Sequence, residues 1–257
     1  MPEVNRKLQY TFSINSFEVM AEYFDKDINN IFLPLIEKLC EMQKAKNARL
    51  IVFLAAPPAT GKTTLSMFLS YLSGISEGAT VIQALGLDGF HYPHSYISGN
   101  TVSVNGKIIP MIDIKGSPET FDLCKAKNRI ELLQKEDVMW PVYDRTVHDV
   151  KEDGLCVKEK IVLIEGNWLL LDEPGWRELV KLCDYSIFIH AEEAFLLQRL
   201  VNRKIAGGKS HDEAMRFCER SDIPNVRRVL KNRLDSDITL KLQENGEFWR
   251  VDDGKEL

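Results

Sequence analysis

The stretch that decides the fold is RLIVFLAAPPATGKTTLSMFL, from Arg49 to Leu69. Its first part, LIVFLAA (50–56), is a continuous apolar run that predicts a buried strand. The residues from Lys62 to about Leu72 have the apolar spacing of a helix. Between them lies A-P-P-A-T-G-K-T (56–63). This octapeptide differs at one position from the phosphate-binding pattern G-x-x-x-x-G-K-[ST], because Ala56 stands in place of the first glycine.

The missing glycine raises the question of whether this turn binds phosphate. In the complete pattern, backbone N–H groups converge on a phosphate at a helix N-terminus, the lysine adds positive charge and the following hydroxyl binds Mg²⁺. Alanine costs little at the first position if φ there stays negative. We therefore expect a working phosphate loop, held to its ligand by the residues around the remaining glycine: Ala59, Thr60, Gly61, Lys62, Thr63 and Thr64. The alternative is a proline-rich turn with a chance Gly-Lys-Thr.

Further apolar runs alternate with amphipathic segments along the chain. The runs at 80–88, 160–166 and 185–191 predict three more strands, and helical patterns separate most of them. Such alternation favours an α/β fold with a parallel sheet covered by helices on both faces. Two Asn-Gly pairs, Asn105-Gly106 and Asn245-Gly246, predict hairpins with two-residue turns. We expect the first to be an insertion beside the site and the second to close the sheet near the C-terminus.

Composition and charge limit the classes of function. With 257 residues, 44% hydrophobic and 28% charged, the chain fits one soluble domain with a small appendage. Its formal net charge of -5 makes nucleic acid a poor partner. Five widely spaced cysteines without a C-x-x-C pair indicate reduced thiols. The N-terminus, MPEVNRKLQYTFSINSFEVM, has charged and polar residues where a signal peptide needs an apolar run, and no stretch approaches the length of a membrane span. We therefore expect a cytoplasmic protein with no membrane partner.

Two carboxylates come at or near strand ends, where a parallel sheet faces its ligand crevice. Asp88, in LDGFHYP, is a candidate to accept a proton from a substrate hydroxyl or to support Mg²⁺. Its alternative role is that of a turn or capping residue. Glu165, at the end of IVLIEG, is a candidate to assist Mg²⁺ together with Thr63, and its alternative role is a structural pair with Lys62.

Five motifs follow one another along the chain: the phosphate loop, D-G-F-x-Y-P, K-G-x-P-E-T-F-D (Lys115 to Asp122), P-V-Y-D-R (Pro141 to Arg145) and I-E-G. In this order they resemble the motifs of the uridine kinase, phosphoribulokinase and pantothenate kinase superfamily. Most are weak alone, but together they are specific and cover roughly residues 50 to 230. The resemblance is greatest to bacterial pantothenate kinases and to a group of nucleoside- or sugar-kinase-like proteins.

The resemblance implies a P-loop NTPase fold that carries ATP- and Mg²⁺-dependent phosphoryl transfer to a hydroxyl of a small molecule. By this resemblance, Asp88 is the base that accepts the proton of the acceptor hydroxyl. Lys62 and Thr63 hold the phosphate and Mg²⁺, and Glu165 assists in binding the metal. The acceptor would be a sugar, a nucleoside or a pantothenate-like compound. Pantothenate itself fits less well, because this chain has D-R-T-V-H after P-V-Y, where the pantothenate kinases have a histidine sooner.

Acceptor contacts and a lid follow from the same comparison. The candidate substrate-binding residues are His91, Tyr143, Arg145 and His148. The alternative is that Tyr143 packs in the core and His148 lies on the surface without contacting a substrate. Arg199 and Arg203 lie on one helix face, and Gly207-Gly208 interrupts the helix before a capping box formed by Ser210 and Glu213. This helix–break–helix resembles the lid of the superfamily (about 199–222), whose arginines would neutralise the transferred phosphoryl group. A solvated basic face is the alternative.

The domain prediction places an N-terminal helical extension at 1–48, packed on the core, and the kinase domain at 49–257. The extension contains Phe32, Leu35, Ile36, Leu39 and Met42 at helical spacing. Related enzymes are often dimers, so a homodimer is one assembly that the resemblance implies. Two other functions remain open at this point: a nucleotide-binding regulatory ATPase without an acceptor, and a polynucleotide kinase, against which the acidic balance argues.

Overall fold

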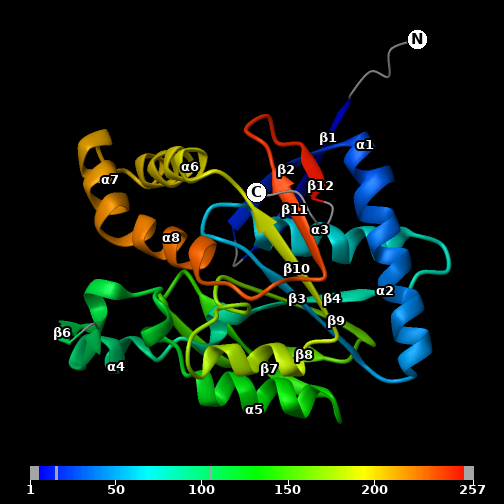
Figure 1. Cartoon of the computed structure of the whole chain (residues 1–257), viewed down its shortest axis with the longest axis horizontal. Helices are drawn as coiled ribbons and strands as arrows, with labels where there is room; N and C mark the ends of the chain where they lie inside the picture. Colours follow the sequence, from blue (N-terminus) through cyan, green and yellow to red (C-terminus); the bar gives the residue numbers. More distant parts are fainter. Residues whose placement is uncertain (1–5, 15–16, 105, 252–257) are drawn as a thin grey trace.

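A six-stranded sheet forms the centre of the protein in the computed structural model, which describes residues 6–14, 17–104 and 106–251 (Figure 1). The strand order is β12-β11-β10-β3-β9-β4. Neighbouring strands are parallel, except that β12 runs antiparallel to β11. The strands are β3 (Leu50–Ala55), β4 (Ile82–Gly86), β9 (Ile161–Gly166), β10 (Tyr185–His190), β11 (Ile238–Leu242) and β12 (Phe248–Val251). The predicted strands and the mainly parallel sheet are confirmed.

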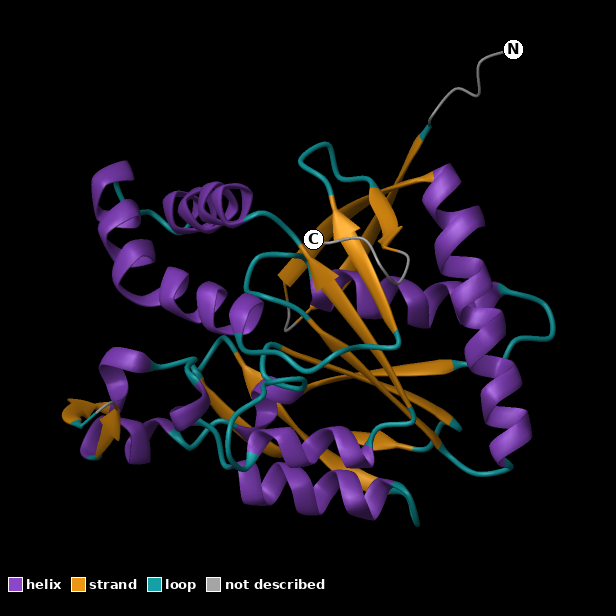
Figure 2. Cartoon of the chain, viewed as in Figure 1, coloured by secondary structure: helices purple, strands orange, loops and turns teal. Residues whose placement is uncertain are grey.

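Helices cover both faces of this sheet because its central strands are apolar on both sides (Figure 2). Leu50, Val52 and Leu54 of β3 point into one core, which α2 (Leu33–Lys46) and α3 (Lys62–Ile75) complete. The alternate residues Ile51 and Phe53 point into a second core, which includes residues of α5 (Leu123–Leu133). All six residues of β3 are buried. The strand therefore holds the phosphate loop on a rigid support.

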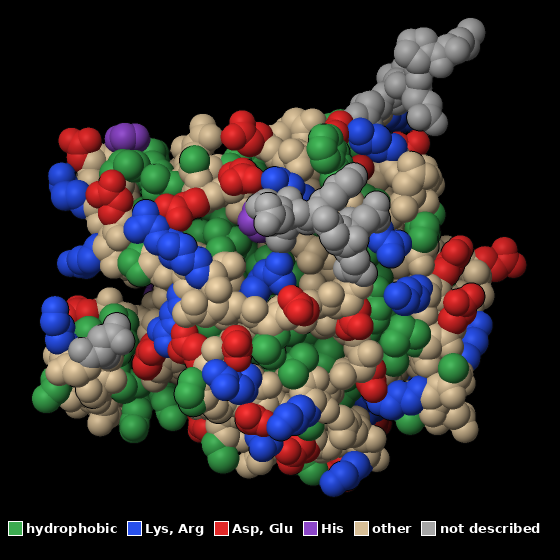
Figure 3. Space-filling view, in the orientation of Figure 1, with side chains coloured by type: hydrophobic (Ala, Val, Ile, Leu, Met, Phe, Trp, Pro, Cys, Tyr) green, Lys and Arg blue, Asp and Glu red, His purple; other side chains and the backbone are tan. Residues whose placement is uncertain are grey.

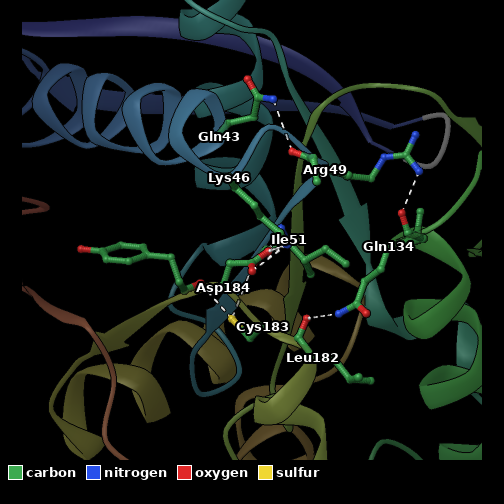
Figure 4. Close-up of polar contacts among 11 residues, drawn as sticks. Gln43, Lys46, Arg49, Ile51, Gln134, Leu182, Cys183 and Asp184 are labelled. Atoms are coloured by element: carbon green, nitrogen blue, oxygen red, sulfur yellow. Dashed lines mark hydrogen bonds and ion pairs between the residues drawn. The ribbon is translucent and has the colours of Figure 1, made fainter.

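Polar contacts link the start of β3 to the residues directly before β10, at the end of the strand opposite the phosphate loop. Figure 4 shows Asp184 beside Lys46 and Ile51. Its carboxylate accepts a 2.8 Å hydrogen bond from the Ile51 backbone N–H and a 2.6 Å bond from Lys46 Nζ. Cys183 Sγ donates to the Ile51 carbonyl at 3.8 Å. These contacts fix the position of β3 relative to its neighbours.

The N-terminal region differs from the helical extension expected over 1–48. It contains an antiparallel hairpin of β1 (Lys7–Ile14) and β2 (Phe17–Phe24), followed by α1 (Asp25–Asp27) and then α2. The hairpin forms because Leu8, Tyr10 and Phe12 alternate with polar residues and pack on the first core. The α2 helix is confirmed, with Pro34 in its first turn. Residues 1–5 of the predicted extension lie outside the described residues.

Hairpins are present at both predicted Asn-Gly pairs. β5 (Thr101–Val104) pairs with β6 (Lys107–Pro110), although Asn105 itself lies outside the described residues. β11 and β12 pair at the sheet edge, but the predicted two-residue turn is wrong, since Leu242 pairs with Phe248. The intervening loop spans residues 243–247 and contacts the N-terminal segment: Lys7 Nζ donates to the Asn245 carbonyl at 2.9 Å, and Lys26 Nζ lies 2.9 Å from Glu247 Oε1.

The remaining elements surround the carboxyl ends of the central strands. β7 (Val138–Asp144) and β8 (Asp149–Val157) form a separate antiparallel pair, and α4 (His94–Gly99) precedes β5. α6 (Glu193–Ala206), α7 (His211–Phe217) and α8 (Ile223–Lys231) form a helical arm, and the predicted Ser210–Glu213 capping box begins α7. Figure 3 shows a hollow at the side of the molecule between this arm and the α4–β6 region.

Candidate functional site

A cleft of about 900 Å³ opens beside the carboxyl ends of β3 and β4. The phosphate loop, the end of the Leu87–Phe90 turn, helix α6, hairpin β1–β2 and the β11–β12 loop contribute to its lining. The predicted site residues that line it are Ala59, Thr60, Gly61, Lys62, Thr63, Thr64, Asp88, His91, Arg145, Arg199 and Arg203. Residues separated by up to 144 positions in the sequence therefore meet in one cavity.

The phosphate loop is curled between β3 and α3. Ala56 is buried and is not among the described non-glycine residues with positive φ, which explains why alanine is accepted there. The left-handed positions are instead Ala59, with φ 69°, and Gly61, with φ 87°. Thr64 Oγ1 donates to the Gly61 carbonyl at 2.6 Å. Hydrogen bonds within the loop, including one from Thr60 Oγ1 to the Pro57 carbonyl at 3.1 Å, thus support its shape.

Thr63 and Glu165 form a direct link between the loop helix and β9. Thr63 Oγ1 donates a 2.7 Å hydrogen bond to Glu165 Oε1. Burial raises the pKa of the Glu165 carboxyl, and the positive charge of Lys62 opposes this shift. A hydroxyl beside a buried carboxylate at the start of the helix is an oxygen pair that suits a hard divalent cation.

Asp88 reaches the cleft because a tight turn follows β4 directly. The turn needs glycine at position 89, since a Cβ there would lie 2.0 Å from the Pro141 carbonyl oxygen. Trp140 Nε1 donates to the Gly86 carbonyl at 2.9 Å and holds β7 against this turn. The carboxylate of Asp88 therefore sits on a backbone that two elements constrain.

His91 lies on the wall of the cleft next to Asp88. Its Nδ1 is 2.9 Å from the Asp88 carbonyl oxygen, so Nδ1 carries the hydrogen, and its ring centroid is 3.8 Å from that of Phe121. Burial lowers the pKa of the imidazole. The side chain is a neutral, oriented group whose Nε2 accepts a hydrogen bond.

Arg199 comes from α6 and lies over the phosphate loop. The position of a Cβ on Gly61 would be 3.6 Å from Arg199 Nη2. The guanidinium also faces the ring of Phe195, with 5.4 Å from Cζ to the ring centroid. Arg203, one turn further along α6, lines the same cleft. The helix predicted as a lid thus brings two cations to the loop.

The structure does not bring Tyr143 and His148 together in the cleft; neither is among its described lining residues. The Tyr143 hydroxyl accepts a 2.8 Å hydrogen bond from Lys115 Nζ, and its ring lies 5.6 Å from that of His91. His148 is exposed in the turn after β7, with φ 54°. Arg145, between them, does line the cleft.

Sequence reasoning missed the contribution of the N-terminal hairpin. Lys7, Met20 and Tyr23 all line the cleft, although they precede the phosphate loop by 33 residues or more. The alternation in KLQYTFSI (7–14) is a signal for a strand, but no local pattern places that strand beside the loop.

Within 6–14, 17–104 and 106–251, no helix is long and apolar enough to cross a membrane. In the same residues, no group of three or more histidine, cysteine or acidic side chains is arranged to hold a metal. A cation here would take its remaining ligands from a bound phosphate chain or water.

Comparison with known proteins agrees with this geometry, although no protein-family model matches the chain. The uncharacterized Escherichia coli (strain K12) protein YggC is 39% identical over 242 residues, which is 94% of this chain and 98% of YggC. A putative uridine kinase of Schizosaccharomyces pombe is 28% identical over 229 residues, covering 86% of this chain and 95% of that protein. The crystal structure of a putative fructose transport system kinase from Silicibacter sp. TM1040 is 29% identical, has a TM-score of 0.66, and matches 78% of this chain and 98% of that one.

The fold and the phosphate loop define the protein as a kinase-like P-loop protein. More narrowly, the chain belongs to the family of P-loop kinases that contains the phosphoribulokinases, uridine kinases and pantothenate kinases.

Proposed function

We propose that the protein transfers the γ-phosphoryl group of ATP to a hydroxyl of a small molecule: a sugar, a nucleoside or a pantothenate-like compound. One observation carries this proposal. A preformed phosphate loop and the carboxylate of Asp88 line the same cleft, so a donor and an acceptor can be bound face to face. The relatives described as a putative uridine kinase and a putative fructose transport system kinase support an acceptor of this size.

The donor would lie with its phosphates on the loop. Backbone N–H groups around Gly61 and the ammonium of Lys62 bind the β- and γ-phosphates. Arg199 and Arg203 approach from α6 and stabilise the charge that spreads over the γ-phosphoryl oxygens during transfer. Movement of the α6–α7 arm toward the loop would exclude water from the cleft.

A Mg²⁺ ion is expected with the nucleotide, and the residues present fit it. The Thr63 hydroxyl would bind it directly and Glu165 would hold one of its waters, as their 2.7 Å contact allows. When bound, the ion would neutralise part of the negative charge on the phosphates.

The acceptor hydroxyl would be oriented by Asp88. As the acceptor oxygen bonds to the γ-phosphorus, the bond from that phosphorus to the oxygen bridging to the β-phosphate breaks, and the hydroxyl proton passes to Asp88. His91 Nε2 and Arg145 face the same cavity and bind polar or anionic groups on the acceptor. Tyr143 acts through His91 and Lys115, since it does not line the cavity.

A regulatory ATPase is the second candidate, because a phosphate loop with a mobile arm also suits a nucleotide switch. The cavity beyond the loop favours the kinase: Asp88, His91 and Arg145 are groups for which a switch has no use.

The test is an ADP-release assay with ATP and Mg²⁺ against pentoses, hexoses, ribonucleosides, sugar phosphates and pantothenate. Lys62→Ala serves as the blank. We expect one acceptor class to stimulate ADP release in the wild-type protein and not in the blank. ATP consumption that no acceptor stimulates would favour the regulatory ATPase instead.

A further inference from the structure

Tyr23 of β2 is buried against the phosphate-loop helix. Its ring stacks on Phe68 of α3, with centroids 4.3 Å apart and an interplanar angle of 18°. A second contact, edge-on to Phe32 at 5.5 Å, also restrains the ring, and Phe32 in turn packs on Phe68 at 5.8 Å. Only 4% of the side chain is exposed, yet Tyr23 lines the cleft. A phenol held in this way presents its hydroxyl at a fixed point.

That point lies beside the start of α3 and the arginine of α6. Thr64 is one turn before Phe68 on the same face of α3, so the ring that stacks on Phe68 lies along the face that carries Thr64, and both Tyr23 and Thr64 line the cleft. A Cβ on Gly61 would be 3.2 Å from Thr64 Oγ1 and 3.6 Å from Arg199 Nη2. Thr64 and Arg199 therefore both lie close to Gly61, and Tyr23 lines the same cleft.

Electrostatics agrees with this placement. Burial raises the pKa of the Tyr23 phenol, so the hydroxyl keeps its proton and is a donor as well as an acceptor. The charge of Arg199 acts on the same phenol. A long arginine side chain has many rotamers, and a buried neutral hydroxyl in the same cleft would reduce their number.

The hairpin that carries Tyr23 is itself fastened to the body of the protein. Buried Asp27, just after β2, accepts a 2.9 Å hydrogen bond from the Phe248 backbone N–H, and Lys7 Nζ donates to the Asn245 carbonyl. Both contacts join the N-terminal segment to β12 or the loop that precedes it. The phenol is therefore placed by the core and not by the arm that carries Arg199.

We propose that Tyr23 is a positioning residue, which holds the guanidinium of Arg199 above the phosphate loop in the orientation that binds the γ-phosphate. The inference rests on the proposed function and deepens it. On this inference, the N-terminal hairpin is part of the donor site. The hydroxyl of Tyr23, and not its ring, favours binding of a nucleoside triphosphate over a diphosphate.

The test compares the affinities for ATP and ADP, each measured by calorimetry with Mg²⁺. Tyr23→Phe keeps the ring and removes the hydroxyl. We expect ATP to bind roughly five- to tenfold more weakly, with ADP affinity unchanged, because only the γ-phosphate contact of Arg199 is lost. Tyr10→Phe is the matched control: Tyr10 also packs on Phe68, at 4.7 Å, but is not among the described lining residues. It should leave both affinities unchanged.

A double-mutant cycle separates positioning from a structural role. In an Arg199→Ala background, Tyr23→Phe should have no further effect on ATP affinity. An unchanged ATP affinity in Tyr23→Phe, an equal loss for ATP and ADP, or a loss that persists without Arg199 would each overturn the inference and leave the proposed function intact. A wild-type protein that binds neither nucleotide would overturn both.

Discussion

Thr63 and Glu165 are joined by a 2.7 Å hydrogen bond that connects the first turn of α3 to the end of β9. Two parts of the chain separated by 102 residues thus form one oxygen-rich contact, in which Thr63 lines the cleft and Glu165 is buried behind it. The sequence motif placed each residue at the end of its element. The parallel pairing of β3 with β9 brings these ends to the same edge of the sheet.

The charge of Glu165 is expected to matter more than its hydrogen bond. Glu165→Gln keeps an oxygen that accepts from Thr63 but removes the negative charge that supports Mg²⁺. We expect the Mg²⁺ concentration for half-maximal ADP release to rise roughly 10- to 100-fold. A Mg²⁺ titration of both proteins measures this, and an unchanged requirement would contradict the assignment.

Asp88→Asn separates binding from transfer. The amide keeps the shape of the side chain but does not take the acceptor proton, so turnover should fall by about 10²–10⁴-fold. ATP affinity, measured by calorimetry, should stay close to that of the wild type, because the loop is untouched. A variant with full turnover would rule out Asp88 as the base.

The turn that carries Asp88 depends on Gly89. In Gly89→Ala, the new methyl group would meet the Pro141 carbonyl oxygen at 2.0 Å, and the backbone has to move. We expect a loss of about 1–3 kcal/mol or more in the free energy of unfolding, measured by urea denaturation.

Gly74→Ala is the control for that substitution. Gly74 lies in α3 and is exposed, and its Cβ would meet nothing within 4 Å. Its replacement should stabilise the protein by about 0.5–1 kcal/mol through helix propensity. Equal effects of the two substitutions would show that close approach at position 89 is unimportant.

An ion-pair cluster predicts how stability changes with pH. Arg228 on α8 bonds to both Glu173 and Glu119, and the hydrogen bond from Arg228 holds the pKa of Glu173 below its usual 4.5. The stabilisation is therefore present above pH 4.5 and is lost as the pH falls through the lowered pKa.

Arg228→Gln should therefore cost about 1–3 kcal/mol near neutral pH, and its deficit should shrink in acid. Arg227→Gln, which breaks a more exposed pair with Glu193, should cost clearly less than Arg228→Gln. Urea denaturation from pH 7 to pH 3 tests both, and a deficit for Arg228→Gln that is constant with pH would be the contrary result.

The part of the site that could be predicted from the sequence lies in contiguous patterns. The strand at 50–55, the glycine turn and the helix from Lys62 each have their own local signal, and their order predicts the phosphate loop. Arg199 and Arg203 were predicted in the same way, because four-residue spacing puts them on one helix face.

What the sequence could not predict depends on tertiary contacts. Tyr23 joins the cleft only because β1–β2 folds onto Phe68, a residue 45 positions away. Tyr143 and His148 have suitable spacing, but β7 ends at Asp144 and the following turn leaves His148 exposed. Spacing alone cannot distinguish one long strand from a strand and a turn.

The central claim is that the cleft transfers phosphate to an acceptor and does not only hydrolyse ATP. Phosphorus NMR of the protein with ATP, Mg²⁺ and the acceptor that stimulates ADP release tests this most directly. We predict a new phosphate-monoester signal that grows in step with ADP and is absent with Lys62→Ala. Growth of inorganic phosphate alone, with no ester signal, would contradict the account.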